Sequence, residues 1–166
     1  IESLKQAFPD IPVIGGGEHI TALPEFSLDD CPSLDISVIG EGEETLVEVV
    51  SALLDGRPLD PVNGIAFRRD GTVMLTEARP RLRNIDEIPP PAWGLFPLAS
   101  YLDNGYGFGV NRGRSMPVLA TRGCPYQCTF CSNPFRWTTG YLMRDPVSVV
   151  DDIEDLMQTY DVKSID

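Results

Sequence analysis

Three cysteines stand close together in the run CPYQCTFC, at positions Cys124, Cys128 and Cys131. Cysteine thiolates are the usual protein ligands of iron–sulfur clusters. The C-x-x-x-C-x-x-C spacing therefore predicts a loop wrapped around one face of a 4Fe–4S cluster. Three protein ligands for four irons leave one iron open, and an open coordination position distinguishes a site that binds substrate from a closed one. The run predicts a catalytic cluster rather than a purely structural one.

Other interpretations of these cysteines stay open at this point. A structural zinc site needs a fourth ligand, and the remaining histidine and cysteine, His19 and Cys31, lie far upstream. An electron-carrier iron–sulfur protein would close the cluster with a fourth ligand. Disulfides are disfavoured, because a chain with no secretory signal points to a reducing compartment and hence to a cytoplasmic protein.

Composition narrows the possible partners. The 166 residues are 42% hydrophobic, which is enough for a buried core, and they carry a net charge of −12. Nucleic acids and anionic membrane surfaces attract clustered Lys and Arg, so this charge argues against both as partners. No apolar run approaches the roughly 20 residues of a transmembrane helix. The composition thus argues against nucleic-acid and membrane partners, and the expected partner is a small-molecule substrate.

Hydrophobic patterns in the first half alternate between strand and helix. Short apolar strands are predicted over 11–17 and 34–39; the first ends in Gly15, Gly16 and Gly17, and the second is followed by Gly40, Glu41 and Gly42. A helix is predicted over 43–54, with an apolar face formed by Leu46, Val49, Val50 and Leu53. The order strand, helix, strand, helix predicts a parallel α/β layer.

The second half begins with a predicted β-hairpin over 63–79, because Asp70-Gly71 supplies the positive φ angles of a tight turn. Residues 80–100 are rich in proline and predict a stiff linker without helix. A strand over 116–121 then leads into the cysteine run. Asp145 and Pro146 predict the start of a helix, as N-cap and first helical residue.

The cysteine run, with the aromatic Phe130 just before its last cysteine, resembles the cluster loop of the radical S-adenosylmethionine (radical SAM) enzymes. The glycine run and the later Gly-Glu-Gly turn resemble the second half of the cobalamin-binding domain that is often fused in front of a radical SAM barrel. Together the two resemblances cover nearly the whole chain.

The resemblance implies three cofactors and a set of residues for each. Cys124, Cys128 and Cys131 would hold the 4Fe–4S cluster, and Phe130 would pack near the adenine of S-adenosylmethionine. Cobalamin would contact Gly15, Gly16, Gly17, Gly40, Glu41 and Gly42. The expected activity is cleavage of S-adenosylmethionine that drives methyl transfer or radical cyclisation and oxidation, with an external electron donor such as flavodoxin or ferredoxin.

The predicted fold class is α/β: a partial Rossmann-like parallel sheet followed by the first β–α unit of a radical SAM (TIM-like) barrel. The predicted boundaries are the latter half of a cobalamin-binding domain over 1–62, a hairpin over 63–79, a linker over 80–100 and the start of the radical SAM domain over 101–166. On this interpretation the chain is a fragment of a longer cytoplasmic enzyme from an anaerobic or facultative prokaryote. The fragment alone is expected to be inactive, and its open strand edges predict oligomerisation.

Overall fold

The computed structural model describes residues 1–107, 110, 112–132 and 140–166. The chain forms two compact units. The first comprises Ile1–Leu82 and the described residues of 126–139, and the second comprises Arg83–Pro125 and Gly140–Asp166. Among the helices of the described residues, none has the length and apolar character needed to cross a membrane.

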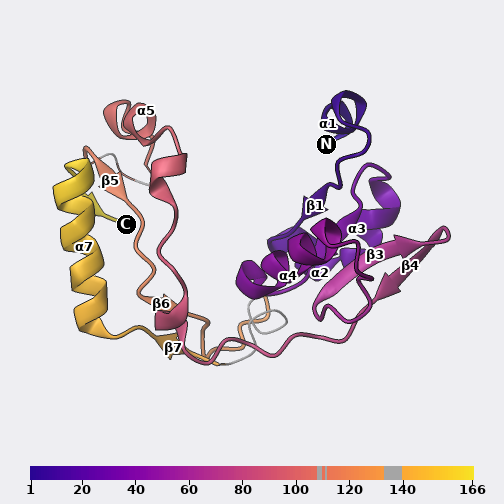
Figure 1. Ribbon diagram of the computed structural model, residues 1–166. Helices are drawn as coiled ribbons and strands as arrows, with labels where there is room; N and C mark the ends of the chain where they lie inside the picture. Colours follow the sequence, from indigo (N-terminus) through magenta and orange to yellow (C-terminus); the bar gives the residue numbers. More distant parts are fainter. Residues whose placement is uncertain (108–109, 111, 133–139) are drawn as a thin grey trace. The chain divides into compact units, whose positions relative to one another are not determined.

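Within the described residues, a four-stranded sheet in the order β1-β2-β3-β4 forms the centre of the first unit (Figure 1). Strand β1 (Ile14–Gly15) runs parallel to β2 (Ile36–Val38). Strand β3 (Ile65–Arg69) lies antiparallel to β2 and pairs with β4 (Thr72–Leu75). The parallel pair confirms the predicted α/β class.

Helices pack on both faces of this sheet, because successive side chains of a strand point to opposite faces. On one face, α4 (Gly42–Leu54) packs Val49 and Ala52 against Ile36, Val38 and Ile65. On the other face, α3 (Pro24–Asp30) buries Leu28 with Leu34 and Ala66. Two short helices complete the unit, α1 (Glu2–Ala7) and α2 (Glu18–Ala22).

The buried face of α4 differs from the predicted one. Thr45, Val49 and Ala52 are fully buried, whereas Leu46 is 45% exposed and Val50 is also exposed. Small side chains at Thr45 and Ala52 let the helix approach the sheet closely, which turns Leu46 to the edge of the contact. The helix boundaries agree with the prediction, and Gly56, at φ +64°, follows its end.

The hairpin predicted over 63–79 is an extension of this same sheet. Its turn lies at Asp70 and Gly71, whose φ angles are 50° and 77°, as the tight primed turn requires. Strand β3 pairs Phe67 with Ile36 and Ile65 with Val38, so the hairpin shares the core of the first unit.

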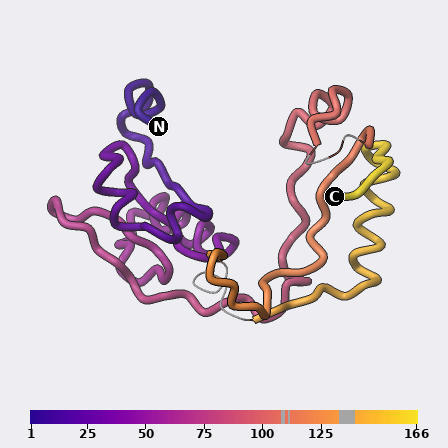
Figure 2. Tube along the Cα trace, turned by 180° about the vertical axis from the view of Figure 1, so that it is seen from behind, coloured from indigo at the N-terminus to yellow at the C-terminus, as the bar shows by residue number. Residues whose placement is uncertain are grey.

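The second unit contains the predicted β–α arrangement. The long helix near the C-terminus is the yellow coil of Figure 2. Strand β5 (Ser115–Met116) is parallel to β8 (Ser164–Ile165), and α7 (Pro146–Tyr160) lies between them in the chain. The strand predicted over 116–121 is divided, however: Pro117 follows β5 and lacks an N–H, and β6 (Thr121–Arg122) pairs instead with β7 (Leu142–Met143).

The core of the second unit is formed by Leu102, Met116, Leu156 and Val162, with Trp93 packed against it. The linker is less irregular than predicted. It contains the 3₁₀ turns η1 (Ile85–Glu87) and η2 (Trp93–Leu95), and α5 (Leu98–Asp103) begins directly after Pro97. A helix can form here because the run of prolines ends before Leu98. The helix is also stabilised because Leu102 packs into the core of the second unit.

Candidate functional site

A cavity of about 510 Å³ lies in the first unit, at the carboxyl ends of the parallel strands β1 and β2. The cavity is lined by Ile14, Gly15, Gly16, Gly17, Glu18, Thr21, Val38, Gly40, Gly42, Glu43 and Leu46. The structure thus brings five of the six residues predicted at this edge into one site, from two turns that are distant in the sequence. The carboxyl edge of parallel strands is the usual ligand position in open α/β sheets.

Glycine occupies these positions at the sheet edge for different physical reasons. Gly17 and Gly40 have φ angles of +92° and +77°, and a Cβ atom at either position would face open space. Gly15 is tightly packed instead: a Cβ atom there would lie 2.5 Å from Ile20 Cδ1 and 2.9 Å from Leu34 Cδ1, so the ends of these two side chains would have to move. Gly17 and Gly40 therefore leave bare backbone at the cavity, where a ligand can approach closely.

The two glycine turns are joined by a side chain that the sequence analysis did not single out. The Gly40 N–H donates to Thr21 Oγ1 at 3.1 Å, which links the second turn to α2. The rest of the wall is apolar at Ile14, Val38 and Leu46 and acidic at Glu18 and Glu43. In the sequence, Thr21 lies one helical turn after the glycine run. This position alone does not distinguish it from an ordinary helix residue.

Glu41, predicted at the same edge, is absent from the cavity lining in the described part of the chain. Its carboxyl side chain is 6% exposed and lies toward the linker. The Leu82 N–H donates to Glu41 Oε2 at 2.7 Å, and Arg81 Nη2 lies 3.6 Å from Glu41 Oε1. Glu41 therefore fastens the start of the linker to the turn that carries Gly40 and Gly42.

The volume of the cavity falls within the range of small-molecule sites. Ligand sites of roughly 300–1,000 Å³ with apolar walls and a few polar groups are typical of small-molecule binding. The exposed backbone of the glycine turns and the wall formed by Ile14, Val38 and Leu46 meet this description. His19 is exposed and lies outside the residues that line the cavity.

The three cysteines of the predicted cluster loop are all thiols. Cys124 belongs to the second unit, and Cys128 and Cys131 belong to the first. The Cys131 N–H donates to Cys128 O at 3.1 Å, so these two residues close a turn. Phe130, within this turn, is 91% exposed. Cys31 lies half-buried against the Leu28 cluster.

The structure by itself does not assemble a metal centre. Over residues 1–107, 110, 112–132 and 140–166, no group of three or more His, Cys, Asp or Glu side chains is placed to hold a metal ion. Ligation by Cys124, Cys128 and Cys131 therefore stays a prediction from their spacing. Three thiolates in one short run remain the donor set that iron–sulfur clusters use.

The fold is that of an α/β protein with a cavity at the carboxyl edge of its parallel strands. No protein-family model matches the chain. Its sequence is 36% identical over 154 residues to an uncharacterized methyltransferase of Pyrococcus horikoshii, covering 93% of this chain and 32% of the relative. It is also 36% identical over 166 residues to the anaerobic magnesium-protoporphyrin IX monomethyl ester cyclase of Rubrivivax gelatinosus, covering 98% of this chain and 29% of the relative.

Among solved structures, the chain resembles TsrM from Kitasatospora setae, a radical S-adenosylmethionine methyltransferase, with a TM-score of 0.67 and 23% identity. That match covers 93% of this chain and 29% of TsrM. A second structure of TsrM has cobalamin and a [4Fe-4S] cluster bound. At this identity the likeness shows a shared fold.

The chain is thus similar to cobalamin-dependent radical SAM enzymes. It spans about a third of the length of the curated relatives it matches.

Proposed function

We propose that the protein is a cobalamin-dependent radical SAM enzyme, with cobalamin held in the cavity of the first unit and a 4Fe–4S cluster held by Cys124, Cys128 and Cys131. The observation that carries this proposal is the 510 Å³ cavity, where both glycine turns meet at the carboxyl edge of the sheet. The homology to radical SAM enzymes of both methyltransferase and cyclase type supports the same function.

The residues of the cavity have separable tasks in this proposal. Gly16, Gly17 and Gly40 allow the cofactor to approach the backbone, and Leu46 contributes apolar surface from α4. Thr21 fixes the spacing of the two turns through the Gly40 N–H. Glu41 lies behind the turn and holds it from the side of the linker.

The cysteine loop supplies the second half of the proposed chemistry. When bound, a reduced 4Fe–4S cluster supplies the electron that splits S-adenosylmethionine into methionine and a 5′-deoxyadenosyl radical, and cobalamin supplies a methyl carrier. Cys124, Cys128 and Cys131 would hold the cluster through their thiolates and leave one iron for S-adenosylmethionine. Phe130 offers an exposed ring to the adenine. The electron is proposed to come from an external donor such as flavodoxin or ferredoxin in a reducing cytoplasm.

Methyl transfer is the first candidate reaction class, because several relatives are named methyltransferases, and that of Pyrococcus horikoshii aligns over 93% of the chain. Radical cyclisation is the second candidate, because the cyclase of Rubrivivax gelatinosus aligns equally well. The products formed from S-adenosylmethionine distinguish the two reactions. A methyltransferase would turn one molecule of S-adenosylmethionine into S-adenosylhomocysteine and a second into methionine and 5′-deoxyadenosine, whereas a cyclase that only abstracts hydrogen would form methionine and 5′-deoxyadenosine without S-adenosylhomocysteine.

Binding of hydroxocobalamin, measured by equilibrium dialysis, tests the cavity directly. Leu46 lines the cavity and is 45% exposed, so Leu46→Gln removes apolar contact surface without opening the core. Covering the exposed part of a leucine side chain is worth about 1 kcal/mol, so this variant should bind about fivefold more weakly.

Val47, the next residue of α4, is 67% exposed and does not line the cavity in the described part of the chain, so Val47→Gln is the matched control. It should bind like the unaltered protein. Absence of binding by the unaltered chain, or equal loss in both variants, would contradict the assignment of cobalamin to this cavity.

A further inference from the structure

The base of the cysteine loop is closed within the second unit by a very short ladder. Strand β6 enters the loop and β7 returns from it, with Thr121 paired to Met143 and Arg122 to Leu142. The Arg144 N–H extends the ladder by donating to Ala120 O at 3.0 Å. A two-stranded ladder of this length is marginal on its own in water. Other contacts must therefore hold the base of the loop together.

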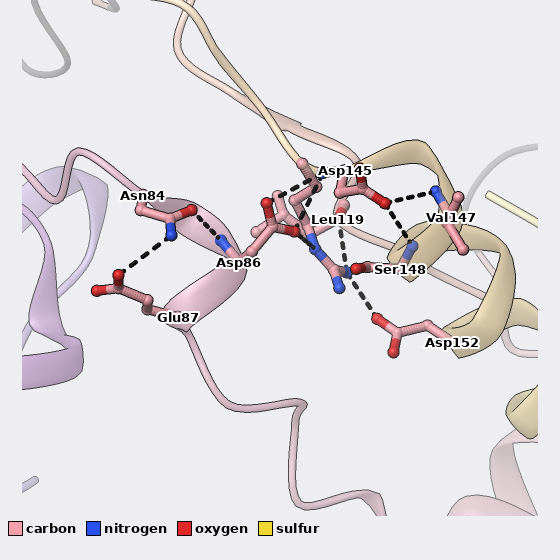
Figure 3. Close-up of polar contacts among 9 residues, drawn as sticks. Asn84, Asp86, Glu87, Leu119, Asp145, Val147, Ser148 and Asp152 are labelled. Carbon is pink, nitrogen blue, oxygen red and sulfur yellow. Dashed lines mark hydrogen bonds and ion pairs between the residues drawn. The ribbon is translucent and has the colours of Figure 1, made fainter.

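The side chain of Arg144 supplies such contacts from the residue that follows β7. Its Nη1 donates to Asp152 Oδ2 at 2.6 Å and to Leu119 O at 3.3 Å, and its Nε donates to Asp86 Oδ1 at 3.3 Å. Figure 3 shows these three partners converging from separate parts of the second unit. Asp86 comes from η1, Leu119 from the segment before β6, and Asp152 from α7. One guanidinium thus joins three segments at the base of the loop.

The surroundings of Arg144 hold it in place. Its side chain is only 14% exposed, and the hydrogen bond to Asp152 raises the pKa of Arg144 above its ordinary value. Asp86 is itself oriented, since it accepts the Asp145 N–H at 3.0 Å, and Asn84 Oδ1 accepts the Asp86 N–H at 3.1 Å (Figure 3). A planar guanidinium suits several fixed partners at once, which a lysine ammonium does not.

We propose that Arg144 is a positioning residue for the iron–sulfur loop: it holds the base of the loop closed and so fixes the backbone from which Cys124 is presented, two residues after β6. The inference rests on the proposed function, because the loop needs a fixed geometry only if it holds a cluster. The contacts themselves belong to the protein chain, and they can be tested without the cluster.

Hydrogen–deuterium exchange of the metal-free protein is the first test. In Arg144→Gln, amides of residues 119–122 and 142–144 should exchange at least tenfold faster than in the unaltered protein, and Arg144→Lys should give an intermediate rate. The matched control is Arg114→Gln, because Arg114 also binds a carboxylate and a backbone carbonyl. Its guanidinium donates to the Asp103 carboxylate, and its Nη2 donates to Tyr160 O at 2.8 Å. That variant should accelerate exchange around Arg114 and the end of α7 only. Unchanged exchange at the loop base in Arg144→Gln, or equal acceleration there in Arg114→Gln, would overturn the proposal.

Iron and sulfide content after anaerobic reconstitution, with electron paramagnetic resonance in the presence and absence of S-adenosylmethionine, is the second test. Arg144→Gln should lose most of the response of the signal to S-adenosylmethionine, with partial rescue by Arg144→Lys, while Arg114→Gln retains it. A loop that exchanges faster but keeps an unaltered signal and response would overturn the positioning role. If the unaltered protein takes up no cluster, the proposed function fails, and the exchange experiment still decides whether Arg144 holds the loop base.

Discussion

Replacing Glu41 by alanine separates a structural role for this residue from a direct role in binding the cofactor. Glu41 belongs to the turn between the two cavity glycines Gly40 and Gly42, yet its carboxylate is buried toward the linker. It accepts the Leu82 N–H at 2.7 Å and pairs with Arg81 at 3.6 Å. The main effect of the variant should therefore be a loss of stability. Ligand binding in the cavity should change only as far as the turn between Gly40 and Gly42 moves.

The expected loss follows from these two contacts. A hydrogen bond to a charged acceptor contributes about 1.5–3 kcal/mol, and its removal leaves the Leu82 N–H without this acceptor. The ion pair with Arg81 is longer, and a partly exposed pair of this kind contributes at most about 1 kcal/mol. We expect Glu41→Ala to lower the free energy of unfolding of the first unit by about 2–3 kcal/mol.

Urea unfolding followed by circular dichroism measures this loss. With a slope of about 2 kcal/mol/M, the midpoint of the first unit's transition should fall by roughly 1 M. Glu44→Ala is the control, because Glu44 lies in the first turn of α4, three residues after Glu41, but is exposed and pairs with Arg79 at 3.3 Å. It should cost less than about 1 kcal/mol. A loss in Glu41→Ala no larger than in Glu44→Ala would refute the role of Glu41 as the anchor of the linker.

Three further predictions test local features of the fold. Asp145→Ala removes the N-cap that accepts two backbone N–H groups of α7, and it should lower the free energy of unfolding in urea by about 1 kcal/mol. Asp145→Ser should restore most of this loss. An unchanged unfolding midpoint in Asp145→Ala would contradict the capping role. Gly15→Ala places a Cβ atom 2.5 Å from Ile20 Cδ1 and should cost about 1–3 kcal/mol, whereas no loss would show that the strand end has room. The hydrogen bond from Lys163 lowers the pKa of Asp161 below its ordinary value of 3.8, so the stabilisation from this pair is complete above that value and is lost as the pH falls through the lowered pKa. In an NMR titration, Lys163→Met should return the pKa of Asp161 toward 3.8, and an unmoved value would exclude Lys163 as the cause.

Features set by neighbouring residues could be predicted from the sequence. The turn at Asp70 and Gly71 and the start of α7 at Asp145 were correct, because positive φ angles and an N-cap depend on residues within a few positions. The parallel pairing of β1 with β2 and the meeting of their two glycine turns also followed, because carboxyl ends of parallel strands share one edge.

Features set by contacts between distant residues could not be predicted in the same way. The side of α4 that is buried depends on how closely Thr45 and Ala52 approach the sheet, and apolar periodicity favoured Leu46 instead. The orientation of Glu41 depends on the linker, whose Leu82 N–H lies far along the chain. The role of Arg144 likewise arises only once η1, the segment before β6 and α7 have come together.

The measurement that tests the central claim most directly is electron paramagnetic resonance of the dithionite-reduced protein after anaerobic reconstitution with iron and sulfide, recorded with and without S-adenosylmethionine. The account predicts a reduced 4Fe–4S signal that changes when S-adenosylmethionine is added and that is lost in Cys128→Ala. A colourless protein with tight stoichiometric zinc, or a cluster whose signal is indifferent to S-adenosylmethionine, would contradict it.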